Sequence, residues 1–179
     1  MLINKFITKI INLLRLYSWR LRGLNTKFTN LLLAKELDIM NPQCLTLNHN
    51  VKLYKNISIY INSKGSVIIG ENSHIAPYGY LLIGNNKLSI GNRVAIGPFC
   101  SIFCHSNYYT DTDNFTNSYI DKDITIGNNV FIGAHSVILP GAIIEDNVVI
   151  GANSVVTAGI VKANAIYAGN PLSFIKAIN

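Results

Sequence analysis

The sequence lacks several features that mark common classes of protein. It contains no run of eighteen apolar residues, although 49% of its 179 residues are hydrophobic and only 13% are charged, which argues against a transmembrane helix. Its three cysteines form no close-spaced pairs, which argues against a disulfide framework or a zinc knuckle and favours a reducing, cytosolic compartment. Aromatic and basic residues do not interleave as in a nucleic-acid platform, so no nucleic-acid partner is expected. The chain has the length of one domain, and its apolar residues need burial by repetition or by subunit contact.

The most regular feature is an aliphatic residue at every sixth position of residues 124–156. The segment reads ITIGNNVFIGAHSVILPGAIIEDNVVIGANSVV, and its periodic positions are Ile126, Ile132, Ile138, Ile144, Ile150 and Val156. A period of six is a multiple of the strand period of two but drifts from the helix period of 3.6, so it predicts extended chain with a turn every sixth residue. Three such hexads make one triangular turn, whose short strands pair in parallel with those of the next turn.

Two other positions of the hexad also repeat. The position after the aliphatic is glycine or small, as at Gly70, Gly97 and Gly133, where we expect the turn to need a permissive backbone. The fifth position is small or modest in size, as at Ser136 and Ala142, so that it can share a narrow interior with the aliphatic. About a dozen hexads follow this pattern, which is typical of a repeat protein.

This pattern resembles the hexapeptide-repeat family of left-handed parallel β-helices over roughly residues 57–176, and the left hand is implied by the resemblance. The predicted fold class is all-β, a left-handed parallel β-helix with a short N-terminal amphipathic α-helix and one extruded loop. The predicted division is a helical or capping segment at 1–44 and a β-helix acyltransferase domain at 45–179. That domain contains a loop at about 106–123 and a C-terminal tail.

The N-terminal stretch, MLINKFITKIINLLRLYSWRLRGL, carries a helical period instead. One face is polar and basic, and the other carries Ile3, Phe6, Ile7, Ile10, Leu14, Tyr17 and Leu21. Two interpretations stay open: the helix caps the end of the coil, as terminal repeats require, or it attaches to an anionic membrane surface. The net charge of +6 suits an anionic partner such as a phosphorylated cofactor or a lipid surface.

The repeat is interrupted once. The separation between Ile102 and Ile126 equals one hexad plus a full turn of three hexads, so the register survives while a polar segment rich in Tyr and Asp leaves the coil. His105 stands at the root of this loop. Long polar loops on rigid scaffolds commonly carry function, so His105 becomes the first candidate for a catalytic residue.

The stretches IGNRVAIGPFCSIFCHSNYYTD, ITIGNNVFIGAHSVILPGAIIEDNVVIGANSVVT and YAGNPLSFIKAI are similar to hexapeptide-repeat O-acetyltransferases that act on sugars. In that family a histidine before the loop is the general base, acetyl-coenzyme A lies in a groove between neighbouring subunits of a trimer, and no metal takes part. The resemblance therefore implies that His105 is the base and that the protein is a homotrimer. It implies cofactor contacts by Phe131 at the pantetheine arm, Gly133 and Ala134 at the thioester carbonyl, Ala152 and Thr157 along the groove, and Lys176 near the phosphates.

The chain departs from the family at several positions. Many relatives have two histidines two residues apart, where this chain has His105 and Asn107, and in another register the base would fall on Asn107. Ser173 and Ala158 stand where basic residues are common, which predicts weaker phosphate binding. A carboxylate commonly orients a catalytic imidazole, and Asp111 or Asp113 in the loop could do so, unless both are solvated loop charges.

The predicted function is transfer of an acetyl group from acetyl-CoA to a sugar hydroxyl, in bacterial surface polysaccharide or lipopolysaccharide biosynthesis. The alternatives are N-acetylation of a nucleotide-linked amino sugar and a non-catalytic structural β-helix. A γ-class carbonic anhydrase is disfavoured because it needs a close pair of histidines, whereas His49, His74, His105 and His135 are all far apart in the sequence. The predicted location is the cytoplasm, with membrane contact left open, and the identity of the sugar is not determined.

Overall fold

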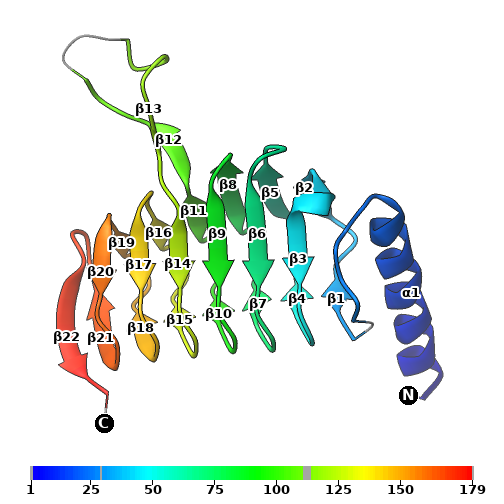
Figure 1. The fold of residues 1–179 in the computed structure, drawn as a ribbon. Coiled ribbons are helices and arrows are strands. Elements are labelled where there is room, and N and C mark those ends of the chain that lie inside the picture. The colour runs from blue at the N-terminus through cyan, green and yellow to red at the C-terminus, as the bar shows by residue number, and fades with distance from the viewer. Residues whose placement is uncertain (1, 29, 111–113, 179) are drawn as a thin grey trace.

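The computed structural model describes residues 2–28, 30–110 and 114–178. It shows a triangular coil of parallel strands, with one helix across its N-terminal end and an arm leaving one corner (Figure 1). In Figure 1 the chain descends the front of the coil, rises along the back and advances from right to left, which is a left-handed path. The predicted fold class is therefore confirmed.

Three sheets form the sides of the coil, and each is built from one strand per turn. The front sheet consists of β3 (Leu45–Leu47), β6 (Ser66–Ile69), β9 (Lys87–Ile90), β14 (Ile124–Ile126), β17 (Ala142–Ile144) and β20 (Gly159–Val161). The rear sheet consists of β2 (Leu37–Met40), β5 (Ile57–Ile61), β8 (Tyr80–Gly84), β11 (Ser101–Phe103), β16 (Val137–Ile138) and β19 (Val155–Val156). The lower sheet consists of β1 (Leu32–Leu33), β4 (Lys52–Leu53), β7 (His74–Ile75), β10 (Ala95–Ile96), β15 (Phe131–Ile132), β18 (Val148–Ile150), β21 (Ala165–Ala168) and the antiparallel β22 (Ser173–Ala177).

The remaining elements are α1 (Leu2–Leu21), the 3-10 helix Pro42–Cys44, and the antiparallel strands β12 (His105–Asn107) and β13 (Tyr119–Asp121) of the arm. The three edges of the coil are named here by what joins them. The front corner connects the front and lower sheets, the rear corner connects the lower and rear sheets, and the loop corner connects the rear and front sheets and carries the arm.

The periodic aliphatic residues form the core. Ile126 pairs with Ile144, Ile132 with Ile150, and Ile138 with Val156, each one full turn further along the chain. All six are at most 1% exposed. The small fifth residues share this interior, because Ser136, Ala142 and Ser154 are fully buried. The strand ladders thus stack identical apolar layers, which removes the apolar surface from water.

The glycines after the aliphatic positions serve a different purpose from the one expected. The residues with a left-handed backbone conformation, that is a positive φ, lie two positions after these glycines. Many of them are asparagines, such as Asn72 and Asn129. Asn adopts this conformation more readily than most residues. Gly133 is needed because consecutive turns touch: a Cβ there would lie 2.5 Å from the amide nitrogen of Ala152. The expectation of a permissive backbone at these glycines was wrong, and close stacking of the turns is the physical reason for them.

Helix α1 lies across the first turn of the coil (Figure 1) and contacts β1. Its Leu16 and Trp19 side chains are buried in the same apolar cluster as Leu31 and Leu33 of that turn. These contacts are those that a capping helix would make. The strand ladders already begin at Leu32 in β1 and Leu37 in β2, before the domain boundary predicted at residue 45. Within the described part of the chain, no helix has the length and apolar character needed to cross a bilayer.

Candidate active site

His105 lies at the loop corner, where the chain leaves β11 and enters the arm. The preceding turn makes room for its side chain at Gly84, which has a left-handed φ of +62°. A Cβ on Gly84 would lie 3.0 Å from the Cβ and 3.4 Å from the Cγ of His105. A glycine at this position therefore lets the imidazole pack closely against the coil.

The His105 side chain is paired with a carboxylate on the opposite strand of the arm. The antiparallel register places Asp121 of β13 directly across from His105 of β12, and Nδ1 of His105 lies 3.0 Å from Oδ1 of Asp121. Nδ2 of Asn86 donates to the same oxygen at 2.7 Å and also donates to the Ile83 and Cys104 carbonyls. The hydrogen bonds from Asn86 and His105 hold the pKa of Asp121 below its ordinary value.

This geometry fixes the tautomer of the neutral imidazole. An ionised carboxylate only accepts hydrogen bonds, so the Nδ1 atom of His105 carries the proton that is donated to Asp121. The Nε2 atom is then the unprotonated nitrogen and can accept a proton from a substrate. The ring of Tyr119 stacks on the imidazole, with 4.9 Å between ring centroids and 21° between planes, which limits its rotation. The side chain of His105 stays 31% exposed, so a substrate can reach it.

The sequence-based expectation for the carboxylate partner named other residues. Asp111 and Asp113 lie outside the described residues, and the structure places Asp121 beside the histidine. A signal for Asp121 was present in the sequence: the coil keeps its register across the loop, so the residues just before Ile124 return to the corner that His105 leaves. The side chain of Asn107 donates to the carbonyl of Phe115 at 2.7 Å and so ties the two sides of the arm together.

Cys104 and the other three histidines have ordinary structural environments. Cys104 is fully buried, and burial raises the pKa of its thiol to about 12, so a nucleophilic pair with the outward-facing His105 is not formed. His49 lies at the front corner, His74 on β7 of the lower sheet, and His135 at the rear corner, where its ring stacks on Phe99. The four histidines therefore occupy separate corners and faces of the coil.

The residues expected to contact the cofactor divide between corners. Gly133, Ala134 and Ala152 lie at the rear corner, between the lower and rear sheets, whereas Thr157 lies at the loop corner two turns beyond His105. One chain thus keeps His105 and Ala134 apart, with the rear sheet between them. A site that uses both residues must combine the loop corner of one copy with the rear corner of another.

The backbone amide of Ala134 is available at the rear corner. It finds no hydrogen-bond acceptor among the described residues. The strand register aligns Ala134 with Pro98 and Pro77 in the two preceding turns, and proline has no amide hydrogen. The ladder therefore does not use the amide at this position, and a substrate oxygen could accept its hydrogen bond.

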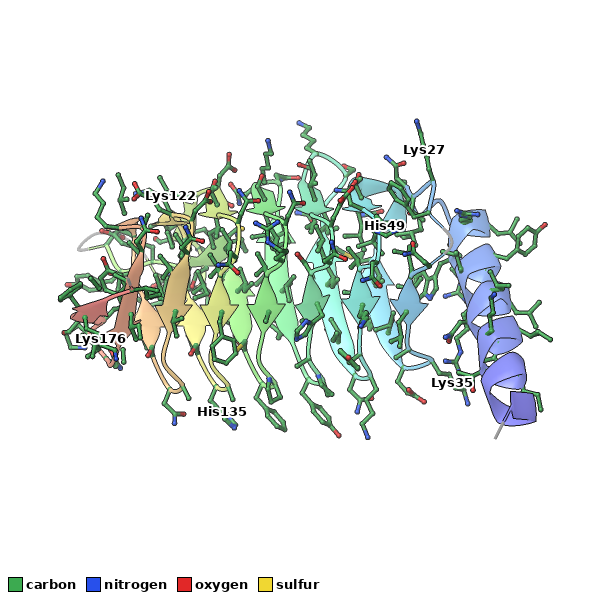
Figure 2. The ribbon with its side chains drawn as sticks, turned by 90° about the horizontal axis from the view of Figure 1, so that it is seen from below. Lys27, Lys35, His49, Lys122, His135 and Lys176 are labelled. Carbon is green, nitrogen blue, oxygen red and sulfur yellow. The ribbon has the colours of Figure 1, made fainter. Side chains whose placement is uncertain are left out.

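Phe131 points outward from β15, between Ala95 and Val149, and is 49% exposed. It borders a groove of about 500 Å³ on the lower sheet, whose other lining residues include Arg93, Asn129, Asn147, Asn164 and Ile178. Lys176 lies on β22 at the C-terminal end of the same sheet, beside Ile166, as Figure 2 shows from below. Both side chains are accessible to a ligand on this face.

Comparison with known proteins gives one family and several relatives. The family described as "bacterial transferase hexapeptide (six repeats)" matches residues 123–158. A protein of Dictyostelium discoideum named an acetyltransferase is 33% identical over 127 residues, which is 71% of this chain and 66% of the relative. Galactoside O-acetyltransferase of Escherichia coli (strain K12) is 37% identical over 123 residues, which is 68% of this chain and 59% of the relative. The chain thus spans 66% and 59% of the length of these two relatives.

Among solved structures, AntD, an N-acyltransferase from Bacillus cereus in complex with dTDP and 3-hydroxybutyryl-CoA, has a TM-score of 0.73. It is 26% identical, and the match covers 84% of this chain and 81% of that chain. The same coil therefore recurs in an enzyme solved with an acyl-CoA. The six-residue repeat, the left-handed coil that it builds and the matched family description show that this chain belongs to the hexapeptide-repeat transferase family.

Proposed function

We propose that this protein transfers an acetyl group from acetyl-CoA to a hydroxyl of a sugar, in the biosynthesis of bacterial surface polysaccharide or lipopolysaccharide. The observation that carries the proposal is the pairing of His105 with Asp121 at the root of the arm. The pairing supplies a proton acceptor, Nε2, on a rigid corner of a coil whose relatives include a galactoside O-acetyltransferase.

The reaction follows from the tautomer of His105. The Nε2 atom takes the proton of the sugar hydroxyl as its oxygen attacks the thioester carbonyl carbon, and the imidazolium that forms is stabilised by Asp121. The tetrahedral intermediate carries its negative charge on the former carbonyl oxygen. Collapse of the intermediate breaks the carbon–sulfur bond, and the departing thiolate takes the proton from Nε2. The products are the acetylated sugar and coenzyme A, and the histidine returns to its starting state.

The amide of Ala134 is well suited to stabilise the oxyanion, because the strand ladder leaves it without an acceptor among the described residues. Since His105 and Ala134 lie at different corners, the active site is assembled from two copies, and the proposed assembly is a homotrimer that closes this contact three times. Acetyl-CoA then lies between copies, against Ala152 and Phe131 of one and Thr157 of the other, with Lys176 contributing charge near its phosphates. Light scattering that finds a monomer at micromolar concentration would contradict the shared site.

A second function has specific support. The structural relative AntD is an N-acyltransferase solved with dTDP, which favours a nucleotide-linked amino sugar as the acceptor. An uncharged amine is a stronger nucleophile than a hydroxyl and depends less on a general base. A turnover screen of acetyl-CoA against sugars, oligosaccharides and nucleotide-linked amino sugars separates the two reactions by the acceptor that is consumed.

The mechanism is tested by His105→Ala. Turnover should fall by on the order of a hundredfold or more, while the affinity for acetyl-CoA stays nearly unchanged, because the base acts on the proton of the acceptor. The control is His135→Ala, at the rear corner, which should cost at most on the order of tenfold. Near-normal turnover of His105→Ala would place the base elsewhere.

A further inference from the structure

The N-terminal helix presents an uncovered apolar face to solvent. Its exposed large side chains are Ile7, Ile10, Ile11, Leu13, Leu14, Tyr17 and Leu21. Leu14, Tyr17 and Leu21 are 64%, 63% and 72% exposed, whereas Leu16 and Trp19 on the opposite side are 2% and 8% exposed. The side of the helix that packs on the coil carries Leu16 and Trp19 together with the half-buried Asn12, Arg15 and Arg20, and the more apolar side is left unpartnered. This arrangement reverses the usual orientation of a surface helix.

The apolar face is a continuous stripe. Ile7, Ile10, Leu14, Tyr17 and Leu21 follow one another at spacings of three or four residues, which places them on one side of the helix. At about 1.5 Å per residue the stripe is about 21 Å long. Contiguous exposed apolar surface of this kind marks an interaction site.

The charge of the molecule is concentrated at the same end. Residues 1–35 contain seven of the fifteen Lys and Arg residues and none of the nine Asp and Glu residues. The rest of the chain carries eight Lys and Arg against nine Asp and Glu, so the net charge of +6 comes entirely from the helical end. Among these cations, Lys9, Arg22, Lys27 and Lys35 are exposed. Figure 2 shows Lys27 and Lys35 on the first part of the coil, near α1 and on opposite edges.

We propose that the outward face of α1 binds an anionic lipid bilayer. The apolar stripe lies along the boundary between headgroups and acyl chains, and the surrounding Lys and Arg side chains contact lipid phosphates. A helix with an apolar face and flanking cations binds in the plane of the interface, and basic residues near the surface add electrostatic attraction to anionic lipids. Since α1 lies across the end of the coil, the coil stands end-on with its C-terminal end away from the lipid (Figure 1).

Charge distinguishes this occupant from a second copy of the chain. Two copies that met through α1 would bring together two segments of seven cations each, without a single acidic residue from residues 1–35 to offset them. Like charges across an interface oppose association. An anionic bilayer supplies both an apolar interior for the stripe and negative charge for its surroundings. The lipid interface therefore fits both properties of this face.

The test is sedimentation of the full chain with lipid vesicles, which requires no enzymatic activity and is independent of the proposed acetyl transfer. Vesicles of about seven parts phosphatidylcholine to three parts phosphatidylglycerol are compared with pure phosphatidylcholine. The intact chain should bind the anionic vesicles at least about tenfold more tightly than the neutral ones. The variant Leu14→Gln/Leu21→Gln should lose on the order of tenfold in binding to the anionic vesicles, because two apolar side chains no longer enter the bilayer.

The matched control is Ile143→Gln/Ile160→Gln, which changes two exposed aliphatic side chains on the front sheet, 42% and 54% exposed, and should bind as the intact chain does. Circular dichroism and thermal unfolding establish that both variants are folded. Absence of binding to anionic vesicles, equal binding to neutral vesicles, or equal losses in the two variants would each overturn the proposal. The proposal would also be overturned if the intact chain formed an oligomer that bound no vesicles and that dissociated only in Leu14→Gln/Leu21→Gln. The stripe would then contact another copy of the chain.

Discussion

Replacing Asp121 with Asn tests whether the carboxylate acts through its charge. In the structure Oδ1 of Asp121 accepts both hydrogen bonds, from Nδ1 of His105 at 3.0 Å and from Nδ2 of Asn86 at 2.7 Å. The amide oxygen of Asn can occupy the same position and accept the same two bonds. Asp121→Asn therefore keeps the geometry and the tautomer of His105 and removes the negative charge that is proposed to stabilise the imidazolium.

The size of the effect follows from the exposure of the pair. A hydrogen bond to a charged acceptor contributes about 1 kcal/mol more than one to a neutral acceptor. The side chains of His105 and Asp121 are 31% and 51% exposed, so water screens the interaction and the larger values found for buried pairs do not apply. About 1 kcal/mol corresponds to a fivefold to tenfold fall in kcat at 25 °C. In Asp121→Ala, which also frees the imidazole to rotate, kcat should fall by on the order of a hundredfold.

The assay is steady-state turnover of acetyl-CoA with its acceptor, with kcat and the KM for acetyl-CoA determined separately. The fall should appear in kcat alone, because Asp121 contacts the proposed base and none of the residues proposed to bind the cofactor. The control is Asp123→Asn, two residues away, whose carboxylate accepts from the amide of Lys87 at 2.7 Å and does not touch the imidazole. Unchanged kcat in Asp121→Asn, or an equal fall in Asp123→Asn, would refute the assigned role.

Three other substitutions probe individual contacts. Gly84→Ala should cost about 1 kcal/mol of folding free energy, measured by thermal unfolding, because Ala disfavours the left-handed φ of +62°. It should also lower kcat, because the added Cβ displaces His105. Normal kcat would show that the imidazole tolerates the shift. Phe131→Ala should raise the KM for acetyl-CoA by about tenfold, whereas Phe131→Trp should leave the KM near that of the intact chain. An unchanged KM in Phe131→Ala would contradict the proposed contact of Phe131 with the cofactor. The hydrogen bond from the backbone amide of Asn128 holds the pKa of Asp146 below its ordinary value. The stability that the ionised Asp146 contributes is therefore present above the unfolded pKa and is lost as pH falls through the folded pKa. Asp146→Asn should reduce the fall in thermal stability at acid pH, and an unaltered dependence of the melting temperature on pH would contradict this.

The sequence by itself determined the coil. The six-residue period can be satisfied only by extended chain with regular turns, and the buried pairing of Ile126 with Ile144 is the direct outcome of that period. It also located the root of the arm, because the register that survives from Ile102 to Ile126 identifies the intervening residues as an insertion. His105 could be chosen from this position and from resemblance to a known family. These features depend on local spacing, which a single sequence records.

Tertiary structure alone decided the contacts between distant residues. Asp121 and His105 are well separated in the sequence, and only the antiparallel register of the arm brings the two side chains within 3.0 Å. Gly84 supports the imidazole from the preceding turn of the coil, a contact that no local pattern encodes. The amphipathic period of α1 predicted an apolar face but not its direction. Packing of Leu16 and Trp19 on the coil turned that face to solvent, because the end of the coil selects the side of the helix that fits it.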